Sequence, residues 1–289
     1  MLFVFAVILA GAWWQRHKII AFFTPHRAPA RHVAVAPSEE PSVAATVPAA
    51  PPSPSASVSP SVTPSPSASG PPRVAIIIDD CGYSMTRDQV FLSLPIPVTL
   101  SILPITPHGR EIAAAATAAG KYAIVHLPME PESSAANPGP GAILTGMTDD
   151  QVRALVASDL DALPPLPGAN NHMGSKASAD KRVMTDVLSV LKERNMFFID
   201  SMTSVASVGG QTARDLAVPT AERAVFLDNQ ATVPYVEGQL RETIARAKAD
   251  GSAIAIGHPN PQTDEALIAM IPQMQAAGIV FVPAQTLVH

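Results

Sequence analysis

Cysteine is nearly absent from this chain, in which Cys81 is the single one among 289 residues. No disulfide can therefore form within the chain, whatever the redox state of its compartment. Cys81 follows an apolar run and two carboxylates, where a thiolate could bind a metal, but a small buried side chain is the better interpretation.

Positive charge is also scarce. Lys and Arg number 19 against 24 Asp and Glu, which gives a net charge of −5 at pH 7. The sequence has no basic stripe with interleaved aromatic side chains, so nucleic acid is not an expected partner. The net charge would not attract an anionic polymer either.

The N-terminal apolar run is short for a transmembrane helix. Residues 2–14 are uninterrupted and apolar, whereas a span needs about 20 residues. Basic residues and a second apolar patch follow, so residues 1–27 fit a signal-peptide core, a signal anchor or a segment on a membrane surface.

The order of charges alone would direct the rest of the chain to the cytoplasm, because the basic residues follow the apolar run. We give this less weight, since start codons are easily misassigned. The cleavage-site pattern at residues 28–30 is weak. We therefore expect an anchor in a bacterial inner membrane, with the folded domain in the periplasm.

Residues 28–72 do not have the composition of a hydrophobic core. Pro, Ser, Ala and Val dominate this stretch, which predicts a disordered linker with extended, partly polyproline II structure. It is either a tether that holds the domain away from a bilayer or a tail of no selected length. The remaining residues, 73–289, are enough for one α/β domain.

Short apolar runs alternate with amphipathic stretches throughout residues 73–289, which is typical of βα units. Helices are expected over 148–163, 180–194 and 236–249, and Thr148 and Gln151 form a capping box at the first. Strands are expected over 74–78, 98–103, 122–125, 168–171, 196–199, 224–227, 253–256 and 279–282. Seven or eight such units favour a closed or nearly closed α/β barrel.

Ionisable side chains recur where the predicted strands end. They are Asp79 and Asp80 for the first strand, His126 for the third, His172 for the fourth, Asp200 for the fifth, Asp228 for the sixth and His258 for the seventh. The carboxyl ends of parallel barrel strands share one face, so these groups should converge on one mouth. Two histidines and a carboxylate suit zinc or another divalent ion, which can promote hydrolysis of an amide or ester. Spacing alone leaves the metal site open, because the candidate ligands come from distant strands.

Six motifs give the chain a recognisable pattern. They are IIIDDCGY at 76–83, GKYAIVHLPMEP at 120–131, NNHMGS at 170–175, FFIDSMTS at 197–204, FLDN at 226–229 and AIGHP at 255–259. Together and in this order they resemble the divergent polysaccharide deacetylase family, a branch of the NodB-like carbohydrate esterases. The resemblance implies a distorted (β/α)7–8 barrel of the NodB-like type.

The resemblance also implies roles for individual residues. In the wider superfamily a DD pair supplies a base and a metal ligand, an HxxxH motif supplies two ligands, and a late histidine is the general acid. Carried over, Asp79 is the expected base, His258 the expected acid, and Asp80 and His126 are expected ligands of a divalent metal, zinc first. Glu130 replaces the second histidine of HxxxH, and we expect His172 to take its place as the third ligand.

Other residues are expected around this centre. Asp200 and Asp228 would orient His258 or the ligand rings. Asn170, Asn171, Ser201 and Thr203 are candidates for hydrogen bonds to sugar hydroxyls or to those two carboxylates.

Two functions follow from the resemblance. The first is a metal-dependent hydrolase that removes acetyl groups from an envelope polysaccharide or a related carbohydrate. The second is a carbohydrate-binding or scaffold protein of the cell envelope that has lost turnover, which the replacement by Glu130 suggests. Retention of Asp79, Asp80 and His258 favours the enzyme.

Overall fold

The structure is a computed structural model that describes residues 70–289. The expected N-terminal segment (1–27) and almost all of the expected linker (28–72) lie outside these residues. Within the described part of the chain, no helix combines the length and apolar character that a bilayer crossing requires.

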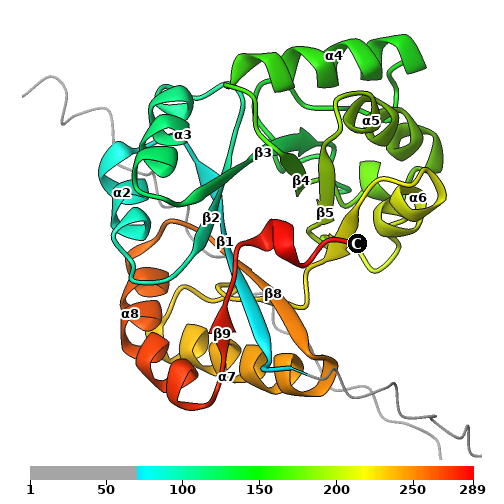
Figure 1. Cartoon of the computed structure of the whole chain (residues 1–289). Coiled ribbons are helices and arrows are strands. Elements are labelled where there is room, and N and C mark those ends of the chain that lie inside the picture. Colours follow the sequence, from blue (N-terminus) through cyan, green and yellow to red (C-terminus); the bar gives the residue numbers. More distant parts are fainter. Residues whose placement is uncertain (1–69) are drawn as a thin grey trace, which may run out of the picture. The chain divides into compact units, whose positions relative to one another are not determined.

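The centre of the domain is a curved sheet whose strands all pair in parallel (Figure 1). The strand order is β6-β5-β4-β3-β2-β1-β8-β7, with β9 paired to the start of β1. The bounds are β1 Arg73–Cys81, β2 Val98–Ile102, β3 Tyr122–Met129, β4 Gly168–Met173, β5 Phe197–Asp200, β6 Thr220–Glu222, β7 Val225–Phe226, β8 Ser252–Gly257 and β9 Val280–Phe281. The sheet curls into a barrel. Because β6 and β7 end the strand order without pairing to each other, the barrel stays open at the seam between them.

Helices surround the outside of the curled sheet in Figure 1. They are α2 Met85–Leu92, α3 Gly109–Ala118, α4 Asp149–Ala162, α5 Lys181–Glu193, α6 Gly209–Asp215, α7 Val233–Asp250 and α8 Pro261–Ala276, with 3-10 turns at Ala177–Ala179 and Ala284–Thr286. The amphipathic helices bury an apolar face, as α5 does with Val183, Val187 and Leu191.

Strand side chains divide the core into two parts. In β1, Ile76 and Ile78 belong to the outer cluster beneath the helices, whereas Ala75 and Ile77 belong to the cluster inside the barrel. This alternation follows from the period of two in a strand. A strand buried on both faces reads as a continuous apolar run, which is why β1 was recognisable in the sequence.

The C-terminal segment fills the end of the barrel at which the strands begin. Ala284 and Leu287 pack in the inner apolar cluster, and His289 exchanges two backbone hydrogen bonds with Thr220 of β6 (3.1 and 3.2 Å). Figure 1 shows this segment, in red, lying across the centre of the barrel. Access to the interior is therefore left at the other end, where the strands finish.

The expected α/β barrel is confirmed, and so is the capping box of Thr148 and Gln151 at α4. β6 was missed, because Thr220–Glu222 has no apolar run and forms a strand through pairing with β5. Three strands extend well beyond their expected ends, β1 to Cys81, β3 to Met129 and β4 to Met173. The carboxylates of β1, His126 and His172 therefore lie inside strands rather than after them.

Candidate metal centre and active site

A cavity of about 400 Å³ opens at the carboxyl ends of the strands. It is lined by Asp79, Asp80, His126, Asn171, His172, Met173, Ser201, Met202, Thr203, Arg223, Phe226, Asn229 and His258. These residues come from β1, β3, β4, β7 and the segments that follow β5 to β8. The expected convergence of distant motifs on one mouth is therefore present in the fold.

A bulge in β1 brings two consecutive carboxylates to this mouth. The register with β2 shifts between Ile78 and Cys81, and Asp80 has a positive φ of 58°. Neighbouring side chains of a regular strand point to opposite faces, whereas a bulge re-aims one of them. Asp79 is thereby buried beside the barrel interior while Asp80 faces the cavity, and both reach His126.

Asp80, His126 and His172 form the one group of candidate metal ligands found among the described residues, with their ligand atoms all within 4.8 Å of one another. Asp80 Oδ1 lies 2.8 Å from His172 Nδ1 and 3.2 Å from His126 Nε2. This oxygen is buried, yet it has no partner with hydrogen-bond geometry within the described part of the chain. A carboxylate oxygen placed between two imidazole nitrogens that are not directed at it fits a divalent cation held among all three.

The electrostatics of Asp80 agree with a charged carboxylate. Burial raises the pKa of the Asp80 carboxyl, but His126 and His172 outweigh this effect and hold that pKa well below its ordinary value. Asp80 therefore stays ionised, which is the form that binds a cation.

Asp79 has a different environment. Burial raises the pKa of its carboxyl, and His126, His258 and a hydrogen bond from Asn170 offset only part of this rise. Its Oδ1 accepts a hydrogen bond from Asn170 Nδ2 at 2.8 Å, and its Oδ2 lies 3.6 Å from His126 Nε2. A carboxylate of raised basicity at the cavity wall can accept a proton.

His258 faces the same cavity from the end of β8. Its Nδ1 lies 2.9 Å from Asp228 Oδ1, and its Nε2 lies 3.8 Å from Asp80 Oδ2. Burial lowers the pKa of the imidazole. The hydrogen bond and negative charge of Asp228, together with the charges of Asp79 and Asp80, outweigh burial and raise that pKa to about 9. Asp228 is itself held by hydrogen bonds from Asn260 and Thr263. Asp228 thus has the orienting contact with His258 that the sequence suggested.

Glu130 lies outside the ligand group. It pairs with Lys176 (2.7 Å) and accepts hydrogen bonds from the backbone and hydroxyl of Thr145 (2.6 and 2.7 Å). The hydrogen bond from Lys176 is the largest cause that lowers the pKa of Glu130, to about 2. Glu130 therefore ties the β3–α4 loop to the segment after β4.

Asp200 has a role other than the expected one. It accepts hydrogen bonds from Met202 N, Ser207 Oγ and Gly210 N, so it holds the turn between β5 and α6. It has no hydrogen bond to a histidine ring among the residues that the structure describes. The difference arises because β5 ends at Asp200 and its side chain turns toward the start of α6.

The four candidates for sugar or carboxylate contacts fall into different places. Asn170 is fully buried and bonds Asp79, so it is closed to substrate. Asn171 Oδ1 accepts a hydrogen bond from Ser201 N, and its Nδ2 donates to Thr203 Oγ1. Asn171, Ser201 and Thr203 line the cavity wall, but none of them bonds Asp200 or Asp228 as suggested.

Five cavity residues were not among the candidates from the sequence: Met173, Met202, Arg223, Phe226 and Asn229. Arg223 donates to the carbonyls of Ser201 (2.6 Å) and Met202 (2.7 Å), and its guanidinium lies 5.1 Å from the ring centre of Phe226. Asn229 completes this side. Phe226 and Asn229 stand in the FLDN motif and could have been found there, whereas Arg223 follows the missed strand β6 and carries no signal of its own.

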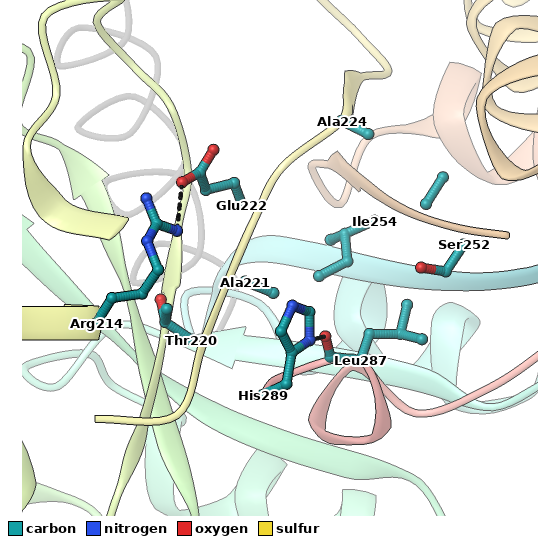
Figure 2. Close-up of a pocket in the computed structure, with 10 residues that line it drawn as sticks. Arg214, Thr220, Ala221, Glu222, Ala224, Ser252, Ile254, Leu287 and His289 are labelled. Carbon is teal, nitrogen blue, oxygen red and sulfur yellow. Dashed lines mark hydrogen bonds and ion pairs between the residues drawn. The ribbon is translucent and has the colours of Figure 1, made fainter. Parts of the chain in front are cut away.

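A second cavity, of about 290 Å³, lies at the seam between β6 and β8. Figure 2 shows its lining, where Arg214 pairs with Glu222 (3.1 Å) and His289 Nδ1 contacts the carbonyl oxygen of Leu287 (3.2 Å). No group of candidate metal ligands was found there within residues 70–289. The mouth, rather than the seam, therefore has the chemistry of an active site.

Comparisons with known proteins agree with this arrangement. The model of the divergent polysaccharide deacetylase family matches residues 76–288. An uncharacterized protein of Haemophilus influenzae is 37% identical over 191 residues, which is 66% of this chain and 68% of that protein. The uncharacterized protein YibQ of Escherichia coli is 33% identical over 199 residues, 69% of this chain and 62% of YibQ.

A crystal structure of an uncharacterized protein from Agrobacterium tumefaciens has the same fold, with a TM-score of 0.72 at 23% identity. The likeness covers 76% of this chain and 91% of that protein. The family match spans all six motifs and every candidate residue at the mouth. The chain therefore belongs to the divergent polysaccharide deacetylase family.

Proposed function

We propose that this protein is a metal-dependent hydrolase that removes acetyl groups from a carbohydrate of the cell envelope. The observation that carries the proposal is the meeting of three potential ligands, Asp80, His126 and His172, with the carboxyl group of Asp79 and the imidazole of His258 in one cavity. Family membership supports deacetylation as the reaction class.

Asp80, His126 and His172 would hold the metal ion, and their donor set suits zinc. A divalent ion bound there would polarise the acyl carbonyl and make a water molecule more acidic. Three protein ligands leave room for a substrate or water oxygen.

Asp79 would accept the proton of the attacking water. Its carboxyl lies at the cavity wall, its pKa is raised above its ordinary value mainly by burial, and Asn170 fixes one of its oxygens. Raised basicity makes proton transfer to this carboxylate more favourable than transfer to an exposed aspartate.

His258 would donate a proton to the leaving amine or hydroxyl. Its pKa of about 9 keeps the imidazole protonated at neutral pH, and Asp228 holds Nδ1 so that Nε2 faces the cavity. Asp79 as proton acceptor and His258 as proton donor would supply the two proton transfers that acid–base catalysis requires.

The cavity suits a sugar unit. Its volume of about 400 Å³ lies within the usual range for small-ligand sites, and Phe226, Asn229 and Thr203 offer an apolar ring face beside polar groups. The apolar N-terminal segment at residues 1–27 would place the domain at a membrane, in the periplasm.

The alternative is a carbohydrate-binding scaffold without turnover. It is favoured by Glu130, which stands where the related motif has a histidine and contacts Lys176 instead of the candidate ligands. The presence of His172 in the ligand group weakens this alternative, because it supplies a third ligand from a neighbouring strand.

Acetate release from acetylated glycan fragments tests the proposal. The full chain, loaded with zinc, should release acetate, and Asp79→Asn should abolish the release while glycan binding persists. Asp159→Asn is the matched control, since Asp159 is an equally buried carboxyl outside the cavity. Glycan binding by the wild type without release of acetate would favour the scaffold.

A further inference from the structure

We infer that Asn170 is a positioning residue that joins the proton acceptor Asp79 and the metal ligand His126 through one side-chain amide. The inference rests on the function proposed above. It adds a connection between the proposed proton acceptor and a proposed metal ligand. The connecting residue is buried and does not line the cavity.

Three strands direct polar side chains at Asn170. Its Nδ2 donates to Asp79 Oδ1 at 2.8 Å, and its Oδ1 lies 2.7 Å from His126 Nδ1 and accepts a hydrogen bond from Ser101 Oγ. The parallel register of β3 and β4 sets His126 directly beside Asn170. All four residues are at most 3% exposed, and buried polar groups of this kind are normally hydrogen-bonded.

The chemistry of the partners fixes the orientation of the amide. Asn170 Nδ2 donates to Asp79 Oδ1, and the amide oxygen accepts from Ser101 Oγ, so the NH₂ group faces Asp79. The amide oxygen must then face His126 and Ser101, which both have to donate. His126 therefore carries a proton on Nδ1, and its Nε2 lies on the side of Asp80.

This arrangement gives the amide two separable tasks. The NH₂ group holds Asp79 Oδ1, which leaves Oδ2 to face His126 Nε2. The oxygen holds the tautomer and ring orientation of His126, a type of contact that usually affects metal affinity. Loss of the amide would leave buried polar atoms of Asp79, His126 and Ser101 without this partner.

Asn170→Asp separates the two tasks because it is nearly isosteric. The variant keeps an oxygen toward His126 and Ser101 but sets a second carboxylate against Asp79 in place of the donor. We expect acetate release to fall about 100-fold or more, while zinc affinity stays within about threefold of wild type. Asn170→Leu removes both contacts, and we expect zinc affinity to fall about 10-fold to 100-fold as well.

The decisive experiment is calorimetric titration of the full chain with zinc chloride, together with ¹⁵N NMR of the histidine rings in the zinc-loaded protein. Wild type and Asn170→Asp should show His126 with a protonated Nδ1, and Asn170→Leu should lose this single tautomer. Thr99→Val is the matched control, because Thr99 is buried on the same strand as Ser101 and its hydroxyl accepts a hydrogen bond from Ala284 N outside the site. The control should keep wild-type zinc affinity and the His126 tautomer.

The outcomes separate this inference from the function beneath it. If wild type binds zinc and releases acetate, and both Asn170 variants match it in affinity, tautomer and turnover, the role of Asn170 is overturned while the proposed function stands. If wild type binds no zinc, the proposed function fails and the inference fails with it. Should Asn170→Leu not fold, Asn170→Asp still decides the matter through the ratio of turnover to zinc affinity.

Discussion

Asp79 at the mouth of the barrel and Asp159 on α4 are both buried carboxyl groups, at 3% and 1% exposure, but their surroundings differ. Asp79 has a hydrogen bond from Asn170 and lies near two imidazoles. Neither oxygen of Asp159 has a hydrogen-bond partner among residues 70–289, and burial alone raises its pKa to about 7.

The loop beside Asp159 explains how its carboxyl is covered. Gly141 has a φ of +80°, and a Cβ at this position would lie 2.6 Å from Asp159 Oδ1. The glycine lets the backbone close over the carboxyl without supplying a charge partner. Burial alone therefore does not mark a catalytic carboxylate; the supply of cationic and amide partners at the mouth does.

The largest expected effect is on the rate of acetate release, which should distinguish Asp79 from Asp159. Asp79→Asn removes the proton acceptor, so acetate release should fall about 10³-fold or more, whereas Asp159→Asn should leave the rate within about twofold of wild type. Steady-state kinetics on zinc-loaded protein measures both. Equal losses in the two variants would contradict the distinction.

The next effect concerns stability and pH. The folded-state pKa of Asp159, about 7, lies above its ordinary value of 3.8, so the folded state binds the proton more tightly than the unfolded state does. Stability should therefore fall as pH rises from 4 through 7, by roughly 2–4 kcal/mol.

Asp159→Asn should remove this part of the pH dependence and leave the variant more stable than wild type at pH 8. Urea unfolding at pH 4.5, 6 and 8 measures the difference between the two proteins. A difference that stays constant over this range would show that Asp159 ionises freely in the fold.

A smaller effect is expected at the orienting carboxylate of His258. Asp228→Asn keeps the size of the side chain but removes the charge that holds Nδ1 of the imidazole at 2.9 Å. Acetate release should fall about 10-fold to 100-fold, with zinc affinity unchanged. An unchanged rate would remove His258 from the role of proton donor.

The smallest effect is expected at Glu130. Glu130→Gln loses the ion pair with Lys176 and weakens the contacts with Thr145, which should cost about 1 kcal/mol of unfolding free energy. Zinc affinity should not change. A clear loss of zinc would return Glu130 to the ligand set and would need a rearranged β3–α4 loop.

Local sequence patterns predicted the barrel because several strands, such as β1 and β8, contain continuous apolar runs. They did not predict β6, whose three residues gain strand structure from β5 and from His289. β-strand propensity is a weak guide to a segment that forms a strand through pairing with residues distant in the sequence.

The positions of Asp80, His126 and His172 followed from strand ends, but the details of the site depend on tertiary structure. The bulge at Asp80 is visible only in the register with β2. The place of Asn170 between β1, β2 and β3 was likewise outside the reach of local reasoning, since its partners lie 44 to 91 residues away in the chain. Asp159 reads as an ordinary polar helix residue until its covering loop is known.

The central claim is a metal ion held by Asp80, His126 and His172, and elemental mass spectrometry of the purified full chain tests it most directly. The account predicts close to one zinc or other divalent ion per chain, lost in His126→Ala and His172→Ala and kept in Glu130→Ala. A wild-type protein that stays metal-free after incubation with divalent ions, or one that loses its metal with Glu130→Ala and keeps it without His172, would contradict the account.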